Sequence, residues 1–372
     1  MVGIYIHIPF CAAKCNYCDF NSHVGTQCEQ ERYIDALCRE IECCGGGEMT
    51  ADTVYFGGGT PTILKPERLL RILTAVKNRF RLDTDCEITT ECNPGTVGGA
   101  ELECLRRGGF NRLSIGMQSA EDEQLKALGR IHSFEDCRKC VIAANAAGFD
   151  NLSVDLMFGL PNQDSDSWKY SLEQAAEFEP SHISAYALKI EEGTPFFEIP
   201  ADELNIADEE LSRDMYDFCN EFLRQCGFRR YEISNFSKKG MESRHNLKYW
   251  RCEDYIGIGA GAHSCRDERR YFNIENTEAY IRSVNECGSA EEDSLALSAA
   301  DKMSEFVYLG LRLADGISEA EFKARFSANI DEVFGAALKL NLNRGTLIRD
   351  EGRIYIPERY VYVSNAIMSD FV

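Results

Sequence analysis

The sequence predicts an α/β fold in which six strand–helix units form a parallel, incomplete barrel and a small domain follows at the C-terminus. Short runs of β-branched or aromatic residues alternate with amphipathic stretches through the first half of the chain. This alternation indicates a parallel sheet, because a helix usually supplies the crossover between parallel strands. The chain has 372 residues, more than most single domains. We therefore expect one large domain and a smaller appended one.

The apolar runs place six strands at residues 3–8, 53–56, 87–91, 112–116, 152–157 and 183–188. The helices between them are clearest at 31–43, 66–80, 134–147 and 167–178, where apolar residues recur at three- and four-residue spacing. Six units fall short of a complete barrel, so we expect a partial (β/α)6 TIM-like barrel over residues 1–228. Its chemistry should lie on the loops that follow the strands.

Two further regions follow the barrel. After an acidic helix at 208–226, residues 230–264 are rich in Gly, Tyr, Asn and His, which indicates loops and short strands that close the barrel. We assign residues 229–298 to this cap and linker region. Residues 299–372 should form a small, helical, winged-helix-like domain, with helices at 302–313 and 318–326 and a hairpin at 346–363.

Composition excludes several classes of protein. The formal charge of -21 predicts an acidic surface that repels phosphate backbones, so we expect no nucleic-acid partner. No apolar stretch is long enough for a transmembrane segment, and the N-terminus lacks a basic and apolar signal sequence. The 17 cysteines are an odd number in a long chain, which favours a reducing compartment over a disulfide framework. We expect a cytoplasmic protein.

Three cysteines, Cys11, Cys15 and Cys18, lie within eight residues directly after the first expected strand. This spacing brings three thiolates within reach of one 4Fe-4S cluster and leaves one iron without a protein ligand. An open metal position is typical of catalytic or ligand-binding sites. The alternatives are three unrelated thiols or a zinc site, which His7 or His23 would have to complete as the fourth ligand.

The pattern CxxxCxYC, with Tyr17 before the last cysteine, resembles the radical S-adenosylmethionine (SAM) superfamily. That superfamily places a glycine-rich loop against SAM after the second strand, where this chain has Gly57, Gly58, Gly59 and Thr60. Glycine suits such a loop because a backbone without Cβ can approach a ligand closely. Taken alone, the triplet is more typical of a plain tight turn. The resemblance implies a radical SAM barrel that binds SAM at the open iron.

Six segments in order resemble one family, the oxygen-independent coproporphyrinogen III oxidases: YIHIPFC, FGGGTPT, FNRLSIGMQS, VDLMFGLP, YALKIEEGTP and IGIGAGAHS. The polar residues at or after the strand ends of these segments could each, taken singly, belong to an ordinary surface or hydrogen-bond network. Carboxylates can hold ribose hydroxyls, and an arginine can pair with the methionine carboxylate. The resemblance implies a SAM-binding shell that comprises Tyr5, Tyr17, Glu91, Gln118, Arg130 and Asp155.

The family has two branches, true oxidases and a branch regarded as haem chaperones. The oxidases carry a further cysteine at the position where this chain has Phe20. They also carry an N-terminal extension ahead of the first strand, whereas in this sequence the first expected strand begins almost at Met1. Residues 245–250 match the HNxxYW motif of the chaperone branch, which is associated there with haem. The resemblance therefore implies haem binding through the side chains of His245, Asn246, Tyr249 and Trp250.

Two functions remain open. The first is a haem chaperone that binds haem beside a SAM-ligated cluster and passes it to a client protein, such as a membrane-associated respiratory enzyme. The alternative is a radical SAM enzyme that decarboxylates porphyrinogen propionates. An imidazole can ligate iron and aromatic rings suit a porphyrin plane, but such a cluster is also typical of core packing. Rival iron ligands in the same region are His263, Cys252 and Cys265.

Overall fold

A parallel sheet forms the centre of the computed structural model, which describes residues 1–45 and 49–372. All six predicted strands are confirmed, and they pair in parallel in chain order. Strands β1 and β5 are buried along most of their length because helices cover their outer face and other side chains pack inside the barrel. The strands are β1 (Val2–Ile8), β2 (Thr50–Gly58), β3 (Arg81–Cys92), β4 (Arg112–Gln118), β5 (Asn151–Phe158) and β6 (His182–Ala187).

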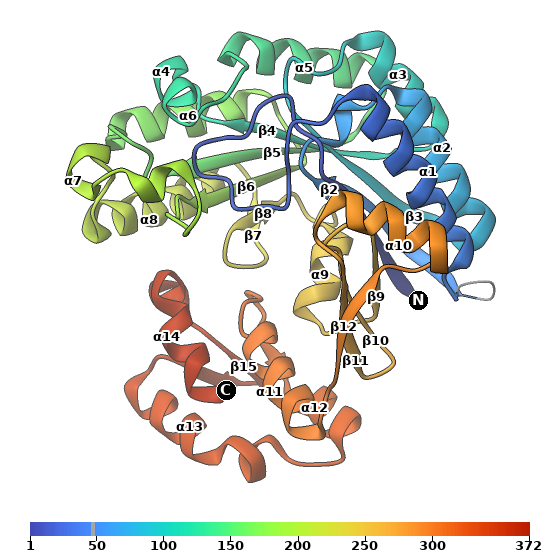
Figure 1. Ribbon diagram of the computed structural model, residues 1–372. Helices are drawn as coiled ribbons and strands as arrows, with labels where there is room; N and C mark the ends of the chain where they lie inside the picture. Colours follow the sequence, from blue (N-terminus) through green and yellow to red (C-terminus); the bar gives the residue numbers. More distant parts are fainter. Residues whose placement is uncertain (46–48) are drawn as a thin grey trace.

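Helices cover the outside of this sheet, as Figure 1 shows. The predicted helices are confirmed with ends shifted by a few residues, and local signals explain their starts: Pro66 begins α2, and Ser133 and Asp164 cap α5 and α6. Three short helices, α3, α4 and α7, were not predicted. The set is α1 (Gln27–Cys43), α2 (Pro66–Arg79), α3 (Gly99–Gly108), α4 (Asp122–Ala127), α5 (Phe134–Ala146), α6 (Ser165–Glu177), α7 (Ala201–Leu204) and α8 (Glu209–Gln225).

The segment after α8 extends the sheet at both edges. One edge continues from β6 to β8 and β7, and the other from β1 to β9, β10, β11 and β12. The two end strands do not pair with each other within the described residues, so the expectation that 230–264 closes the barrel is wrong. The elements are β7 (Arg229–Arg230), β8 (Asn235–Ser237), α9 (Arg244–Trp250), β9 (Tyr255–Ile258), β10 (His263–Arg266), β11 (Arg269–Asn273), α10 (Thr277–Cys287) and β12 (Glu291–Ala296).

The C-terminal part, orange to red in Figure 1, combines helices with the antiparallel sheet β13-β15-β14, a winged-helix-like arrangement. The predicted hairpin is confirmed only as far as Tyr355, because the chain turns at Pro357 into a 3-10 helix. Helix α13 was not predicted. The elements are α11 (Ala299–Gly310), β13 (Ile317–Ser318), α12 (Glu319–Phe326), α13 (Ile330–Arg344), β14 (Ile348–Asp350), β15 (Arg353–Tyr355) and α14 (Ser364–Met368).

A buried carboxylate fixes the added strands onto the barrel. Glu40 of α1 accepts hydrogen bonds from the Asn273 amide at 2.6 Å, the Tyr280 hydroxyl at 2.6 Å and the Gly259 N–H at 2.9 Å. Burial raises the pKa of Glu40, and the three donors act against that rise. Because the partners come from the turn after β9, from β11 and from α10, one side chain holds three later segments against α1.

We expect Glu40→Ala to lower the free energy of unfolding by roughly 2–4 kcal/mol, since it leaves three buried donors without an acceptor. Urea unfolding followed by circular dichroism measures the change. Glu40→Gln is the matched control and should lose less, because it keeps the volume and one acceptor oxygen. Equal stabilities of Glu40→Ala and the wild type would remove this network from the account.

Candidate functional site: a cavity at the barrel mouth

The three predicted cluster cysteines lie on the loop between β1 and α1. Two backbone hydrogen bonds hold the ends of this loop together: the Cys11 N–H donates to the His23 carbonyl at 2.9 Å, and the His23 N–H donates to the Pro9 carbonyl at 2.8 Å. All three thiols are free, half-buried and line one cavity of about 700 Å³ at the carboxyl ends of the strands. The structure therefore brings Cys11, Cys15 and Cys18 to one wall of the barrel mouth.

Each of these sulfurs has a polar neighbour. Thr60 Oγ1 donates to Cys11 Sγ at 3.6 Å, Arg130 donates to Cys15 Sγ at 3.7 Å, and Ser22 Oγ lies 3.9 Å from Cys18 Sγ. Hydrogen bonds to thiolates stabilise an iron–sulfur cluster and adjust its potential. Among the residues that the structure describes, no three His, Cys, Asp or Glu side chains are grouped tightly enough for a single metal ion.

The glycine loop after β2 packs directly on the cysteine loop. Gly58 has a φ of +110°, and a Cβ there would lie 2.5 Å from the His7 ring. A Cβ on Gly59 would lie 2.7 Å from the Phe10 carbonyl oxygen and 3.0 Å from Cys11 Sγ. Gly57 is equally confined, because its Cβ would lie 2.9 Å from a Glu91 oxygen. The close approach of protein atoms therefore requires glycine at these three positions, and a contact between this loop and SAM stays a prediction.

Glu91 stands at the end of β3 and faces this loop. It accepts hydrogen bonds from the Tyr55 hydroxyl at 3.0 Å and from the Gly58 N–H at 3.2 Å. Burial raises its pKa from the ordinary 4.5 to about 7, and the nearby charge of Asp155 adds to the rise. A carboxylate with this pKa can accept hydrogen bonds from ligand hydroxyls near neutral pH.

Arg130 is held at the cavity wall by the Asn93 side chain, to which it donates at 2.5 Å, and by the Gly116 carbonyl at 2.9 Å. Its Nε is buried and has no hydrogen-bond partner within the described residues. Arg112, which lines the same cavity, also has an unpartnered Nε. Unsatisfied buried N–H groups of arginine are costly, so the wall is suited to an anionic ligand group.

Four further residues were predicted for the SAM shell, and three of them line the large cavity. Gln118, with a φ of 64°, and Asp155 both line the large cavity, and Asp155 accepts hydrogen bonds from Ser114, Ser153 and Ser184. Tyr17 also lines it. Tyr5 does not: its ring, on strand β1, stacks on that of Tyr55 from the neighbouring strand β2, with centroids 6.2 Å apart, and its hydroxyl lies 3.1 Å from His7 Nδ1 in the adjacent groove. The structure thus gathers all the residues predicted for this shell except Tyr5 around one cavity.

The HNxxYW segment forms helix α9, with Ser243 as its N-cap. His245 is fully buried, and both ring nitrogens are engaged: Nδ1 lies 2.8 Å from Thr53 Oγ1 and Nε2 lies 2.9 Å from the Tyr249 hydroxyl. Burial, aided by the charge of Lys248, lowers the pKa of His245 to about 3, so the ring is neutral. Iron ligation by this imidazole would require one of its hydrogen bonds to break.

The remaining residues of this motif reach the cavity. Asn246, Tyr249 and Trp250 line it, and the Arg312 guanidinium stacks on the Trp250 ring at 4.2 Å. Trp250 Nε1 is buried without a hydrogen-bond partner among the described residues. Part of the opposite wall comes from the C-terminal segment through Tyr362 and Asn365. The motif therefore brings the Tyr249 and Trp250 side chains to the wall of the cavity.

Comparisons with known proteins agree with this geometry. Residues 5–175 match the model of the radical SAM superfamily, and residues 297–360 match the HemN C-terminal domain. The heme chaperone HemW of Bacillus subtilis is 33% identical, with coverage of 100% of this chain and 99% of that protein. HemW of Escherichia coli is 36% identical over 87% of this chain and 85% of its own length.

The chain belongs to the haem chaperone (HemW-type) branch of the radical SAM superfamily. A mitochondrial relative from Mus musculus, the radical S-adenosyl methionine domain-containing protein 1, is 33% identical over 94% of this chain and 82% of its own length. The solved coproporphyrinogen III oxidase (HemN) of Escherichia coli superposes with a TM-score of 0.87 at 24% identity, with coverage of 100% of this chain and 89% of that chain. That likeness confirms the fold.

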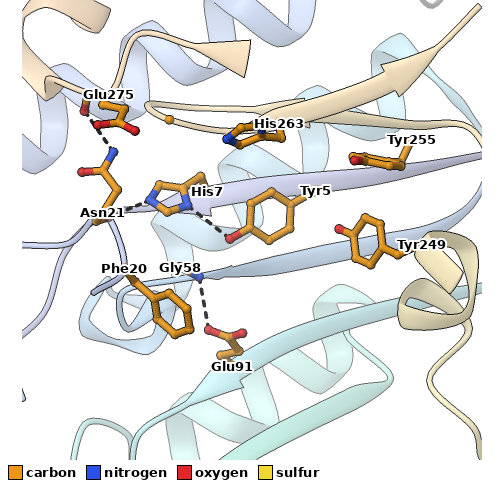
Figure 2. A pocket seen from close by; sticks show the side chains of 11 residues that line it. Tyr5, His7, Phe20, Asn21, Gly58, Glu91, Tyr249, Tyr255, His263 and Glu275 are labelled. Carbon is orange, nitrogen blue, oxygen red and sulfur yellow. Dashed lines mark hydrogen bonds between the residues drawn. The ribbon is translucent and has the colours of Figure 1, made fainter. Parts of the chain in front are cut away.

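A second, open groove of about 410 Å³ lies beside the radical SAM cavity (Figure 2). Its walls include Tyr5 and His7 of β1, Tyr255 of β9 and His263 of β10. Four residues line both spaces: Phe20, Gly58, Glu91 and Tyr249. Of the rival iron ligands, His263 lines the groove, whereas Cys252 and Cys265 line neither space. The HemW-type helix α9 therefore stands between two adjacent cavities.

Several residues of the radical SAM site were missed in the sequence. Tyr55 and Asn93 hold Glu91 and Arg130, and Arg112 and Arg312 bring positive charge to the cavity. Position at a strand end could have indicated Asn93, which follows β3 directly. Nothing in the sequence indicated Arg312, which reaches the cavity from the loop after α11.

We expect Gly59→Ala to reduce the iron bound after anaerobic reconstitution, because its Cβ would displace the backbone that carries Cys11. Iron content and visible absorbance measure the effect. Gly335→Ala is the matched control, since a Cβ at that position meets no atom within 4 Å. A Gly59→Ala protein with the full iron content of the wild type would show that this contact does not constrain the loop.

The raised pKa of Glu91 predicts a pH-dependent stability. A carboxyl that binds its proton more tightly in the folded chain stabilises the fold below its unfolded pKa, and this contribution is lost as the pH rises through about 7. In protein without ligands, we expect Glu91 to account for a loss of about 1 kcal/mol in unfolding free energy between pH 6 and pH 8.

Urea unfolding at both pH values measures this change. Glu91→Gln keeps an acceptor oxygen for the Gly58 N–H and should show a smaller loss of stability over the same interval. Glu173→Gln, at an exposed position on α6, is the control and should behave as the wild type. The same pH dependence in Glu91→Gln and the wild type would contradict the assignment.

Proposed function

We propose that the chain is a haem chaperone in which Cys11, Cys15 and Cys18 hold a 4Fe-4S cluster, SAM binds at the open iron, and haem binds next to it for transfer to a client protein. The observation that carries this proposal is the position of Tyr249 on α9, in the wall of both the thiol-lined cavity and the adjacent groove. The names of the relatives support it, since several are called heme chaperones.

The residues of the large cavity fit the bound cofactors. The cluster would supply electrons and an iron site for SAM. Arg130, with its unpartnered Nε, suits the methionine carboxylate of SAM, and Glu91 suits hydroxyl groups of the ribose. Gln118, Asp155 and the glycine loop complete the shell around the same space. Tyr17, which lies on the cluster loop, lines this space beside Arg130.

Helix α9 supplies the haem contacts in this proposal. Tyr249 offers its ring to both the large cavity and the adjacent groove, and Trp250 and Asn246 add an aromatic face and an amide on the side of the large cavity. His245 acts by orienting Tyr249, because its Nε2 lies 2.9 Å from the Tyr249 hydroxyl while Thr53 fixes the other side of the ring. His245→Ala should therefore weaken haem binding without a loss of iron from the cluster.

The proposed setting is the cytoplasm, in agreement with 17 cysteines that are all free thiols. Among the described residues, no helix is long and apolar enough to cross a bilayer. The proposed partner is a haem-accepting client protein. A formal charge of -21 disfavours nucleic acid.

The alternative function is the decarboxylation of a porphyrinogen, for which the shared fold is the supporting observation. The chain lacks the further cysteine of the true oxidases, and Phe20 occupies its position with 63% of its surface exposed. A thiol has been replaced there by an apolar side chain that neither ligates metal nor moves a proton. This substitution favours ligand binding over the oxidase reaction.

The deciding experiment is anaerobic and uses the reconstituted full chain with SAM and a reductant. We expect haem to bind and then to move to an apo-haem protein, and we expect coproporphyrinogen III to stay unchanged, as judged by porphyrin chromatography. Decarboxylated porphyrin at catalytic turnover would make the chain an oxidase. Protein with a verified cluster that binds no haem would overturn the chaperone proposal.

A further inference from the structure

An imidazole that ligates haem iron needs a free ring nitrogen and open space in front of it. Three of the six histidines have both ring nitrogens within hydrogen-bond distance of a partner, namely His7, His182 and His245. His132 is buried and lines neither cavity. His23 also lines neither cavity, and its Nε2 lies 2.8 Å from Glu29.

His263 differs from the other five. Its ring is exposed, makes no hydrogen bond within the described residues, and lines the groove of Figure 2. One face stacks on Phe272 across the β10–β11 ladder, with ring centroids 5.3 Å apart. The ring is thus supported from behind while both nitrogens remain available.

The turn before His263 is held rigidly. Gly259 and Gly261 have φ values of +111° and +69°, and a Cβ on Gly261 would lie 2.7 Å from the Asn21 amide nitrogen. The Asn21 side chain donates to the Ala260 carbonyl at 3.2 Å, and the Ala262 carbonyl accepts from the Asn273 N–H at 3.0 Å. This turn therefore fixes the start of β10, and with it His263, relative to the cluster loop.

The groove next to His263 is lined by aromatic rings. Tyr249 packs edge-on against Tyr255 with centroids 4.7 Å apart, and Tyr5 lies beside them in Figure 2. Phe20, two residues after the last cluster cysteine, also lines the groove and leaves 63% of its surface in contact with solvent. An exposed phenylalanine beside tyrosine rings suits the burial of a flat apolar ligand.

We infer that this groove is a haem site in which His263 is the axial ligand of the iron. The inference rests on the proposed function and adds to it the residue that ligates the haem iron, the groove that holds the haem, and the orientation of the haem in that groove. Haem here covers Phe20, Tyr249 and Tyr255 and lies next to the cluster loop through Phe20 and Gly58, which line both cavities.

Charge sets the orientation of the haem. The carboxylates that line the groove are those of Glu91 and Glu275, and no lysine or arginine lines it. The two propionates are therefore repelled from the groove and point to solvent, with the apolar edge of the macrocycle inward. One exposed edge leaves the haem accessible to a client protein.

The test titrates ferric and ferrous haem into the anaerobic full-length protein and records the Soret and visible bands, together with electron paramagnetic resonance of the ferric form. His263→Ala should change the spectrum from that of histidine-ligated iron to that of iron without this ligand, and weaken affinity at least about tenfold. Free imidazole should restore the histidine-type spectrum in His263→Ala. His23→Ala is the matched control, and His245→Ala should keep the ligand spectrum.

The outcomes separate this inference from the proposed function. If the wild type binds haem with histidine ligation and His263→Ala has an unchanged spectrum, the inference is overturned and the chaperone proposal stands. If the wild type binds no haem, the proposed function itself fails. Phe20→Ala provides a second variant that leaves the ligand in place, and it should weaken affinity while the spectrum of ligated iron is retained. Unchanged affinity in Phe20→Ala would contradict the placement of haem in this groove.

Discussion

The turn after β2 lies against the cysteine loop without room for a side chain, and the rest of the site depends on this contact. The Gly59 N–H donates to the Ile8 carbonyl and the Thr60 N–H to the Phe10 carbonyl, both at 2.8 Å. These bonds join the end of β1 to the end of β2, so the thiols and the glycine loop keep a fixed relation. Because parallel strands end at the same mouth, Glu91 and Arg130 then face the same space.

Helix α9 connects this barrel mouth with the outer groove. Its buried side holds His245 and Lys248, which bind Thr53 and Asp52 of β2, and its other side presents Tyr249 and Trp250. The imidazole of the motif thus positions the helix, and in the proposed function the aromatic residues contact the ligand. This division explains how one short motif can be associated with haem while its histidine has no free nitrogen.

The strands and most helices could be predicted because their apolar periodicity is local. The grouping of Cys11, Cys15 and Cys18 at one cavity could be predicted because the three thiols lie within eight residues, and their role as cluster ligands stays a prediction. The engagement of both His245 ring nitrogens in hydrogen bonds could not be predicted, since one partner, Thr53, lies 192 residues away in the chain. The roles of Arg312 and Tyr362 depend on how the C-terminal segment packs against the barrel, which no local pattern encodes. The position of Tyr5 outside the large cavity could not be predicted for the same reason, because it depends on packing against Tyr55 and His245.

The central claim is that three thiolates hold a cluster with one iron open to SAM. Electron paramagnetic resonance of the reduced, reconstituted protein tests it directly, with spectra recorded before and after addition of SAM. We predict that SAM changes the spectrum, because its amino and carboxylate groups bind the open iron. An identical spectrum with and without SAM, in protein that contains its full complement of iron, would contradict the account.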